Sequence, residues 1–165
     1  NQKTKDGHKN IYQSKDNLNN LREFHQITTY IEKSVNKNIF NYIQNKKLKL
    51  IKMWIVITKN LGNMKKHSHF NADFSGVLYV RVDNNKNYCG GLKIHNAMQN
   101  IDIYTYSRKR KIFQKSINRK KSFIFRPKKN DLIIFNSYIE HGVDNKTSNN
   151  VDRISLPFDL VFNTK

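Results

Sequence analysis

The chain has 165 residues, of which 37% are hydrophobic and 12% aromatic, and this size and composition predict one folded domain rather than a disordered segment. Its single cysteine, Cys89, excludes an intrachain disulfide and favours a reducing, cytoplasmic location, and no apolar run approaches the roughly 20 residues that a membrane-spanning helix needs. The formal net charge of +19 favours anionic partners, although an abundance of Lys, Asn and Ile is equally what an AT-rich genome would encode.

The N-terminal part of the chain divides into a polar start and a helical region. Residues 1–15 are polar and charged, so we expect a flexible arm there. Asp16 can cap a helix, and apolar side chains then recur at intervals of three and four residues, the spacing of a helix with one apolar face. A second stretch with this spacing covers about residues 35–46. Residues 16–46 are therefore expected to form helices that support one face of a sheet, within a single domain over residues 16–165.

From Leu48 onward the period of the apolar residues changes to two, which is typical of β-strands. Turn residues, for example at 60–63 and 127–131, separate a series of short strands. Many short strands after a helical start predict a mainly β fold with N-terminal helices, an antiparallel barrel or sandwich whose core covers residues 48–162.

Two histidines, His67 and His69, stand at the head of one alternating apolar run. Because residues i and i+2 of a strand lie on the same face, both imidazoles would point to one side, which is how a metal site can begin. A third histidine, His141, follows a second apolar stretch, and Arg153 lies twelve residues further on. Three imidazoles, or two and a carboxylate, on one side of Fe(II) leave the other side open for a co-substrate and dioxygen. A buried arginine beside such a site suits a carboxylate, and Ser155 would point the same way as Arg153.

The ordered set His67-Ser-His69, His141 and Arg153 resembles the motif of the 2-oxoglutarate- and Fe(II)-dependent oxygenase superfamily, and the resemblance covers about residues 52–162. It implies a double-stranded β-helix, which is a jelly-roll fold of the cupin kind. Other segments are similar to strands of prolyl hydroxylases or to a bacterial and phage group of such oxygenases. These segments are Met53-Trp54, Phe74–Val80, Gly90–Ile94, Asp131–Ser137 and His141-Gly-Val.

The resemblance implies a dioxygenase that uses Fe(II), 2-oxoglutarate and dioxygen, and that hydroxylates an unidentified substrate with release of succinate and CO2. In such a site the metal ligands are the only catalytic side chains, and further residues hold the far carboxylate of 2-oxoglutarate. The residues in these roles would be His67, His69 and His141 for the metal and Arg153, Ser155 and Tyr79 for the co-substrate.

The chain departs from the superfamily at one position, because the acid expected two residues after the first histidine is His69 here. Either the site is all-histidine, as in related cupin barrels, or a carboxylate comes from elsewhere. Asp73 is the nearest candidate and would replace His67 as a ligand, and Asn71 is a further candidate. An all-histidine site would also leave open a metal other than iron.

A basic stretch covers residues 107–129, with eleven Lys and Arg residues and no acidic one. Phe113, Phe123 and Phe125 lie among these residues, and we expect them to be core residues of strands rather than stacking platforms for bases. Such a surface could follow a phosphate backbone. The alternative function is therefore a non-enzymatic, metal-containing β-barrel that binds nucleic acid or another polyanion.

Overall fold

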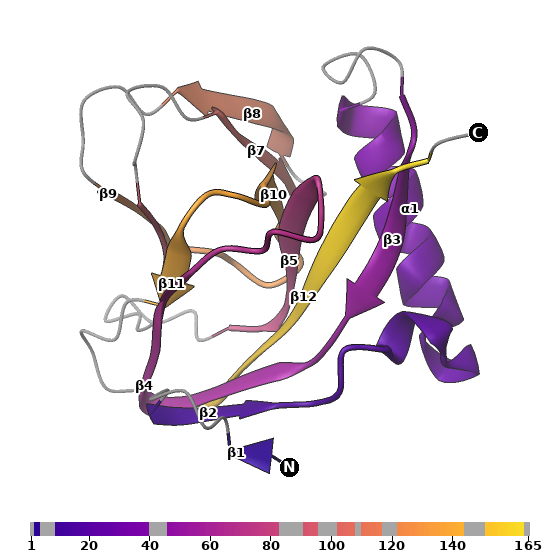
Figure 1. Cartoon of the computed structure of the whole chain (residues 1–165). Coiled ribbons are helices and arrows are strands. Elements are labelled where there is room, and N and C mark those ends of the chain that lie inside the picture. Colours follow the sequence, from indigo (N-terminus) through magenta and orange to yellow (C-terminus); the bar gives the residue numbers. More distant parts are fainter. Residues whose placement is uncertain are drawn as a thin grey trace.

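The computed structural model describes residues 2–3, 9–39, 46–82, 91–95, 102–107, 110–116, 122–143 and 151–163, without the side chains of residues 2–9 and 102–116. A short helical part precedes the strands (Figure 1). The helices are the 3-10 helices η1 (Leu18–Asn20) and η2 (Arg22–Phe24) and the α-helix α1 (His25–Ile39). The strands are β1 (Gln2–Lys3), β2 (Lys9–Gln13), β3 (Leu48–Met53), β4 (Val56–His67), β5 (Phe74–Arg81), β6 (Leu92–His95), β7 (Asp102–Ser107), β8 (Arg110–Ser116), β9 (Ser122–Phe125), β10 (Leu132–Asn136), β11 (His141–Val143) and β12 (Arg153–Phe162).

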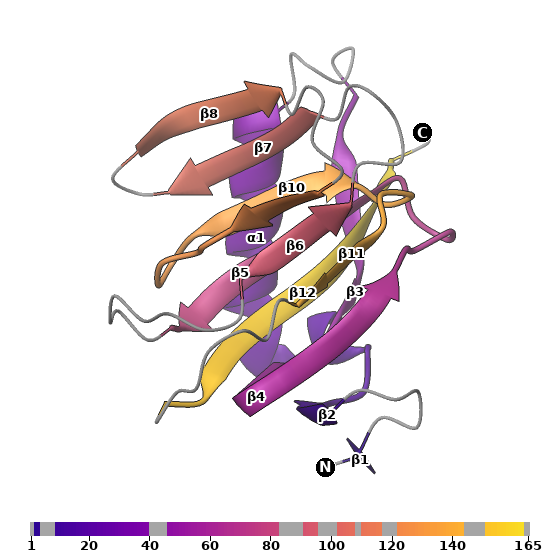
Figure 2. The ribbon, with the colours of Figure 1, turned by 90° about the vertical axis from the view of Figure 1, so that its left-hand side faces the viewer.

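The strands form one strongly curled antiparallel sheet. Its neighbours follow the order β8-β7-β10-β5-β12-β4-β11-β6-β9, with β3 beside β12 and β2 beside β4. Figure 1 shows the curl from its end, with α1 on the outside of β3 and β12. In Figure 1 strands β9 and β11 lie across from β5 and β12, so the two parts of the curled sheet form layers that face each other, and Figure 2 views these layers face on. The predicted mainly β architecture is confirmed.

Strand β4 is the element that joins the two layers. Its first half pairs with β12 through Val56–Thr58, and its last part pairs with β11 through Met64 and His67. Between these halves Leu61 has a φ of 55°, a left-handed conformation that bends the strand. The turn predicted at 60–63 is therefore wrong. The chain bends there without reversing, because β2 pairs with β4 on both sides of the bend with a shifted register.

Two apolar clusters fill the two sides of the sheet. Outside the curl, α1 presents Ile31 and Val35, which are 0% exposed, to the cluster that contains Phe158 of β12. Inside the curl, a second cluster contains Val77 and Tyr79. Consecutive residues of β5 thus alternate between the clusters, as the pleat of a strand requires. The period of two that identifies the strands also decides which side chains line the interior.

The N-terminal region differs from its predicted form in three respects. The two expected helical stretches belong to one helix, α1, although residues 40–45 lie outside the described part of the chain. Asp16 does not act as a cap, because its carboxylate pairs with the ammonium group of Lys52 at 3.1 Å. Residues 9–13, within the predicted arm, form β2 and pair with β4. No helix in the described part of the chain is long and apolar enough to cross a membrane.

Candidate metal centre and co-substrate cavity

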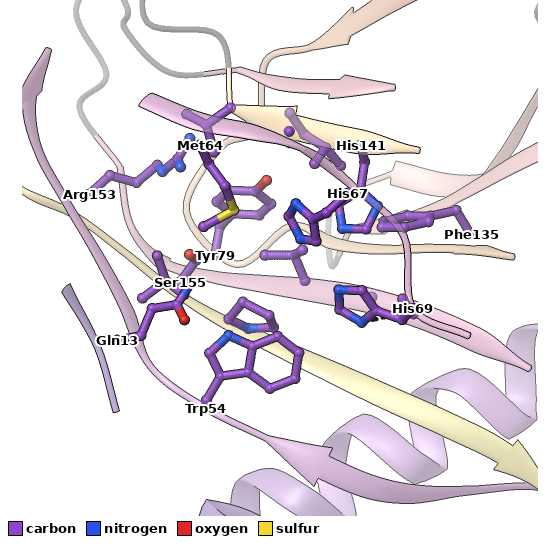
Figure 3. Close-up of a pocket in the computed structure, with 18 residues that line it drawn as sticks. Gln13, Trp54, Met64, His67, His69, Tyr79, Phe135, His141, Arg153 and Ser155 are labelled. Atoms are coloured by element: carbon purple, nitrogen blue, oxygen red, sulfur yellow. Dashed lines mark hydrogen bonds between the residues drawn. The ribbon is translucent and has the colours of Figure 1, made fainter. Parts of the chain in front are cut away.

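The three predicted histidines meet at the open end of the curl. His141 begins β11 and lies opposite His67 at the end of β4 in the antiparallel register. His69 follows β4 after one residue, and its backbone N–H donates to the carbonyl of Ser137 at 2.9 Å. One potential ligand atom from each imidazole lies within 4.8 Å of the others (Figure 3). Among the described residues, this is the group of three or more His, Cys, Asp and Glu side chains that can hold a metal ion.

Backbone carbonyls orient two of the three rings. His67 Nδ1 lies 3.0 Å from the carbonyl oxygen of Lys65, and His141 Nδ1 lies 2.9 Å from that of Ile139. A carbonyl oxygen only accepts, so each Nδ1 carries the proton and donates it. In both rings Nε2 then carries the lone pair that a metal ion requires.

The third ring is oriented by an acidic side chain. His69 Nδ1 lies 2.7 Å from Oδ1 of Asp159, which also accepts a hydrogen bond from Ser75 Oγ at 2.7 Å. The Asp159 side chain is nearly buried, with 8% of its surface exposed. His69 therefore has the same arrangement as the other two rings, with Nδ1 donating and Nε2 available to a metal.

Burial also favours the neutral, metal-binding form of His141. Its surroundings lower the pKa to about 3, first through desolvation and second through the neighbouring His67. At neutral pH the ring therefore carries no proton on the nitrogen that would bind a cation.

The predicted co-substrate residues lie at the other end of the same cavity. In Figure 3 Arg153 lies on the side opposite the imidazoles, with Tyr79 between them. Arg153 is 4% exposed, its Nη2 donates to Oγ1 of Thr58 at 3.0 Å, and its Cζ lies 5.9 Å from the centre of the Tyr79 ring. Ser155 lies opposite Tyr79 in the register of β12 and β5. The cavity of about 50 Å³ is lined by all six predicted residues, His67, His69, His141, Tyr79, Arg153 and Ser155.

This arrangement fits a metal ion together with a dicarboxylate. The imidazole end offers three neutral nitrogen donors, and the other end offers a buried guanidinium and a hydroxyl group. Apolar side chains such as Val77 and Phe135 form the walls between the ends.

The alternative ligand Asp73 is engaged elsewhere. Its Oδ2 accepts a hydrogen bond from the backbone N–H of Phe162 at 2.7 Å, and its own N–H donates to the carbonyl of Leu160 at 2.9 Å. Asp73 thus ties the start of β5 to the end of β12. Asn71 lines a neighbouring groove rather than the cavity that contains the histidines.

That groove, with a volume of about 550 Å³, adjoins the cavity and shares Gln13, Trp54 and His69 with it. Phe70 is 86% exposed and belongs to the groove lining, next to His69 in the chain. Sequence reasoning missed Gln13, because it lies in the stretch predicted as an arm. Trp54 forms a wall of the cavity, 5.7 Å from the His69 ring, measured between ring centres.

The basic stretch at 107–129 lies largely outside the described side chains. Arg126, Lys128 and Lys129 are described and exposed. Phe123 and Phe125 pack against the inner apolar cluster, as expected for core residues, whereas the side chain of Phe113 is not described. Binding of nucleic acid or another polyanion through this stretch stays a prediction.

Comparisons with known proteins agree with this geometry. Residues 52–159 match the profile of a family described as "Putative 2OG-Fe(II) oxygenase". A comparison with curated protein sequences found no match.

Solved structures share the fold at low sequence identity. An oxidoreductase of the 2OG-Fe(II) oxygenase family from Burkholderia pseudomallei superimposes with a TM-score of 0.55 and 13% identity, covering 93% of this chain and 71% of that one. A prolyl hydroxylase from Trichoplax adhaerens, in complex with a hypoxia-inducible-factor peptide fragment, gives 0.54 and 12%, covering 92% and 62%. HygX from Streptomyces hygroscopicus, with nickel and 2-oxoglutarate bound, gives 0.56 and 8%, covering 96% and 72%. These similarities confirm the predicted double-stranded β-helix fold.

Proposed function

Because this chain belongs to the 2OG-Fe(II) oxygenase family, we propose that it is an Fe(II)- and 2-oxoglutarate-dependent dioxygenase that hydroxylates a substrate still to be identified. In this reaction one oxygen atom of O2 enters the substrate and the other enters succinate, and CO2 leaves. The observation that carries the proposal is one cavity with three imidazoles at one end and a buried arginine at the other.

In the proposed site, His67, His69 and His141 hold Fe(II) through Nε2. The iron and 2-oxoglutarate, when bound, supply the oxidising chemistry. The protein holds the three rings in a fixed tautomer, since each Nδ1 is engaged by a carbonyl or carboxylate oxygen. The ligand set therefore needs little rearrangement to receive a cation.

Arg153 is proposed to bind the far carboxylate of 2-oxoglutarate. Its guanidinium is planar and can donate two parallel hydrogen bonds, and Thr58 anchors one of its nitrogens. Ser155 and Tyr79, 3% and 2% exposed, are proposed to donate hydroxyl hydrogen bonds to the same carboxylate. Because this end is buried, little water competes for these bonds, and the charge-assisted contacts are strong.

The primary substrate is proposed to approach through the adjoining groove. Trp54 and His69 line both the groove and the cavity, so a molecule in the groove would reach the open side of the metal. Phe70 and Trp54 offer apolar faces, while Gln13, Ser14 and Asn71 offer polar contacts. The lining also contains two acidic residues, Asp16 and Asp159, and one basic residue, Lys52, so it suits a polyanion poorly.

The proposal is tested with purified protein, Fe(II), 2-oxoglutarate and ascorbate under air. Ascorbate supplies the two electrons that the missing substrate would otherwise provide. We expect succinate and CO2 in equal amounts, dependent on added Fe(II) and lost in His141→Ala. Titration of 2-oxoglutarate into Mn(II)-loaded protein without oxygen measures binding independently of turnover. Absence of both binding and succinate would overturn the proposal.

A further inference from the structure

Asp159 occupies an unusual position for an acidic residue near a candidate metal centre. It does not belong to the three-residue group that can hold the metal, but its Oδ1 lies 2.7 Å from Nδ1 of the ligand candidate His69. Ser75, its partner across the β5–β12 register, donates a second hydrogen bond to the same oxygen at 2.7 Å. The carboxylate is therefore one imidazole ring away from the proposed metal position.

The residue that lies opposite Asp159 on the neighbouring strand β3 does not neutralise the charge of the Asp159 carboxylate. Lys52 of β3 lies opposite Asp159, but its ammonium group pairs with Asp16 at 3.1 Å. A nearly buried carboxylate is costly unless a positive group or strong donors compensate it. The N–H of His69 is such a donor, and it becomes a stronger one when Nε2 binds a cation.

The total charge of the proposed metal centre also indicates a role for Asp159. Three neutral imidazoles leave both positive charges of a divalent metal uncompensated, whereas two imidazoles and a carboxylate compensate one. Asp159 brings one negative charge to the site through the His69 ring. With Asp159 included, an all-histidine centre has the same total charge as a centre that contains a carboxylate ligand.

We infer that Asp159 is a positioning residue that orients His69 for metal binding and supplies, through this ring, the negative charge that the three ligands lack. The inference rests on the proposed metal centre. Ser75 supports the carboxylate and contributes no charge of its own.

The inference is tested by comparing Mn(II) affinity, measured by electron paramagnetic resonance, in the wild type and in Asp159→Asn. The amide has nearly the same shape and keeps an acceptor oxygen, so the variant removes mainly the charge. We expect Mn(II) affinity to fall about 10- to 100-fold, the effect typical of losing an outer-shell partner of a ligating histidine. Affinity within about threefold of the wild type would overturn the inference. If the wild type itself binds no Mn(II), the metal centre fails instead.

Asp73→Asn is the matched control. Asp73 also accepts a backbone hydrogen bond, from Phe162 at 2.7 Å, but it contacts none of the three histidines. Mn(II) affinity of this variant should equal that of the wild type. A loss equal to that of Asp159→Asn would mean that any reduction of acidic charge weakens the site, and would overturn the specific role of Asp159.

A measurement on the wild type covers the case in which Asp159→Asn does not fold. In Zn(II)-loaded protein with ¹⁵N-labelled histidine, nuclear magnetic resonance should show a strongly downfield Nδ1 proton on His69, since this proton is shared with a carboxylate. His69→Gln identifies the signal by its loss. Zn(II) coordinated through Nδ1 of His69, or a His69 ring without that proton, would overturn the inference.

Discussion

His67 and His141 lie directly opposite each other on strands β4 and β11, with 4.4 Å between their ring centres. The first half of the same strand β4 places Thr58 opposite Arg153 of β12. One bent strand therefore spans the cavity and sets the separation between the proposed metal end and the proposed carboxylate end. Substitutions at the imidazole end should weaken metal binding, whereas substitutions at the arginine end should weaken 2-oxoglutarate binding. Separate titrations of the two ligands can test this difference.

Replacement of His141 by alanine should abolish metal binding and turnover. The variant loses one of three nitrogen donors, and a water molecule that fills the space left by the buried ring is a weaker ligand than an imidazole. We expect at least a 100-fold loss of Mn(II) affinity, on the order of 3 kcal/mol, and no detectable succinate. Metal content and succinate formation are the measurements.

His95→Ala is the control for that variant. His95 lies on β6, next to the Ile94 that pairs with His141, but it is not part of the cavity lining. Metal binding and succinate formation should stay within about twofold of the wild type. A comparable loss in both variants would show that His141 acts through the packing of β6 and β11 rather than as a ligand.

Replacement of Arg153 by lysine should weaken 2-oxoglutarate binding and leave metal binding intact. Lysine keeps the charge but lacks the planar fork that matches a carboxylate, and its ammonium group would not reach the same position. Losing a hydrogen bond to a charged group costs about 1.5–3 kcal/mol, so a rise in Kd of at least about 10-fold is expected. The measurement is titration of 2-oxoglutarate into Mn(II)-loaded protein without oxygen.

An unchanged Kd for 2-oxoglutarate in both Arg153→Lys and Arg153→Ala would exclude the proposed carboxylate contact. A cupin-like enzyme that does not use 2-oxoglutarate would instead show no 2-oxoglutarate binding in the wild type, and its turnover would be insensitive to Arg153→Ala. Thr58→Val provides a graded comparison, because Thr58 only anchors one guanidinium nitrogen. Its effect should be smaller, about 1 kcal/mol for the loss of one hydrogen bond.

The site residues could be found from sequence because most of them follow the period of strands. His67, Arg153 and Ser155 lie on strands, and the two-residue period indicates which of them share a face. Their order along the chain, together with His141, resembles the motif of one oxygenase superfamily. The fold of that superfamily then predicts a curled sheet that brings the two histidine segments and Arg153 to one cavity. The two-residue period also puts Val77 and Tyr79 on the same face of β5, and this face meets the inner apolar cluster.

The features that were missed depend on pairing between distant segments. Gln13 lines the cavity only because β2 pairs with β4, and no apolar pattern in residues 1–15 predicts this pairing. The bend at Leu61 has the residues of a turn, but neighbouring strands on both sides keep the chain extended. Similarly, the contact of Asp159 with His69 bridges 90 positions and follows from the register of β12 against β5.

Gly76→Ala should destabilise the fold, because the ring of Phe158 packs directly on this glycine. An added Cβ would clash with Cζ of Phe158 and would lie 2.7 Å from the carbonyl oxygen of Ile133. The buried ring and the paired backbone have little room to move, so we expect a loss of about 1–3 kcal/mol, the range for overpacked cores. Val80→Ala on the same strand is the control, since Val80 is 38% exposed. Urea unfolding measures both, and equal effects would show that Gly76 is not uniquely constrained.

Addition of Mn(II) should stabilise the protein against heat, and chelation should reverse the effect. The proposed ligands come from two segments far apart in the sequence, residues 67–69 at the end of β4 and His141 on β11, so an ion can bind them together only in the folded chain. At a free metal concentration of 100 times Kd, this linkage is worth about 2.7 kcal/mol. For a chain of this size the melting temperature should rise by roughly 5–11 °C. Differential scanning calorimetry with Mn(II), with Mn(II) and chelator, and with His141→Ala gives the measurement. An equal rise in the melting temperature of His141→Ala would mean that the stabilising ion binds elsewhere on the chain. Such a result would contradict the proposed role of the three histidines as metal ligands.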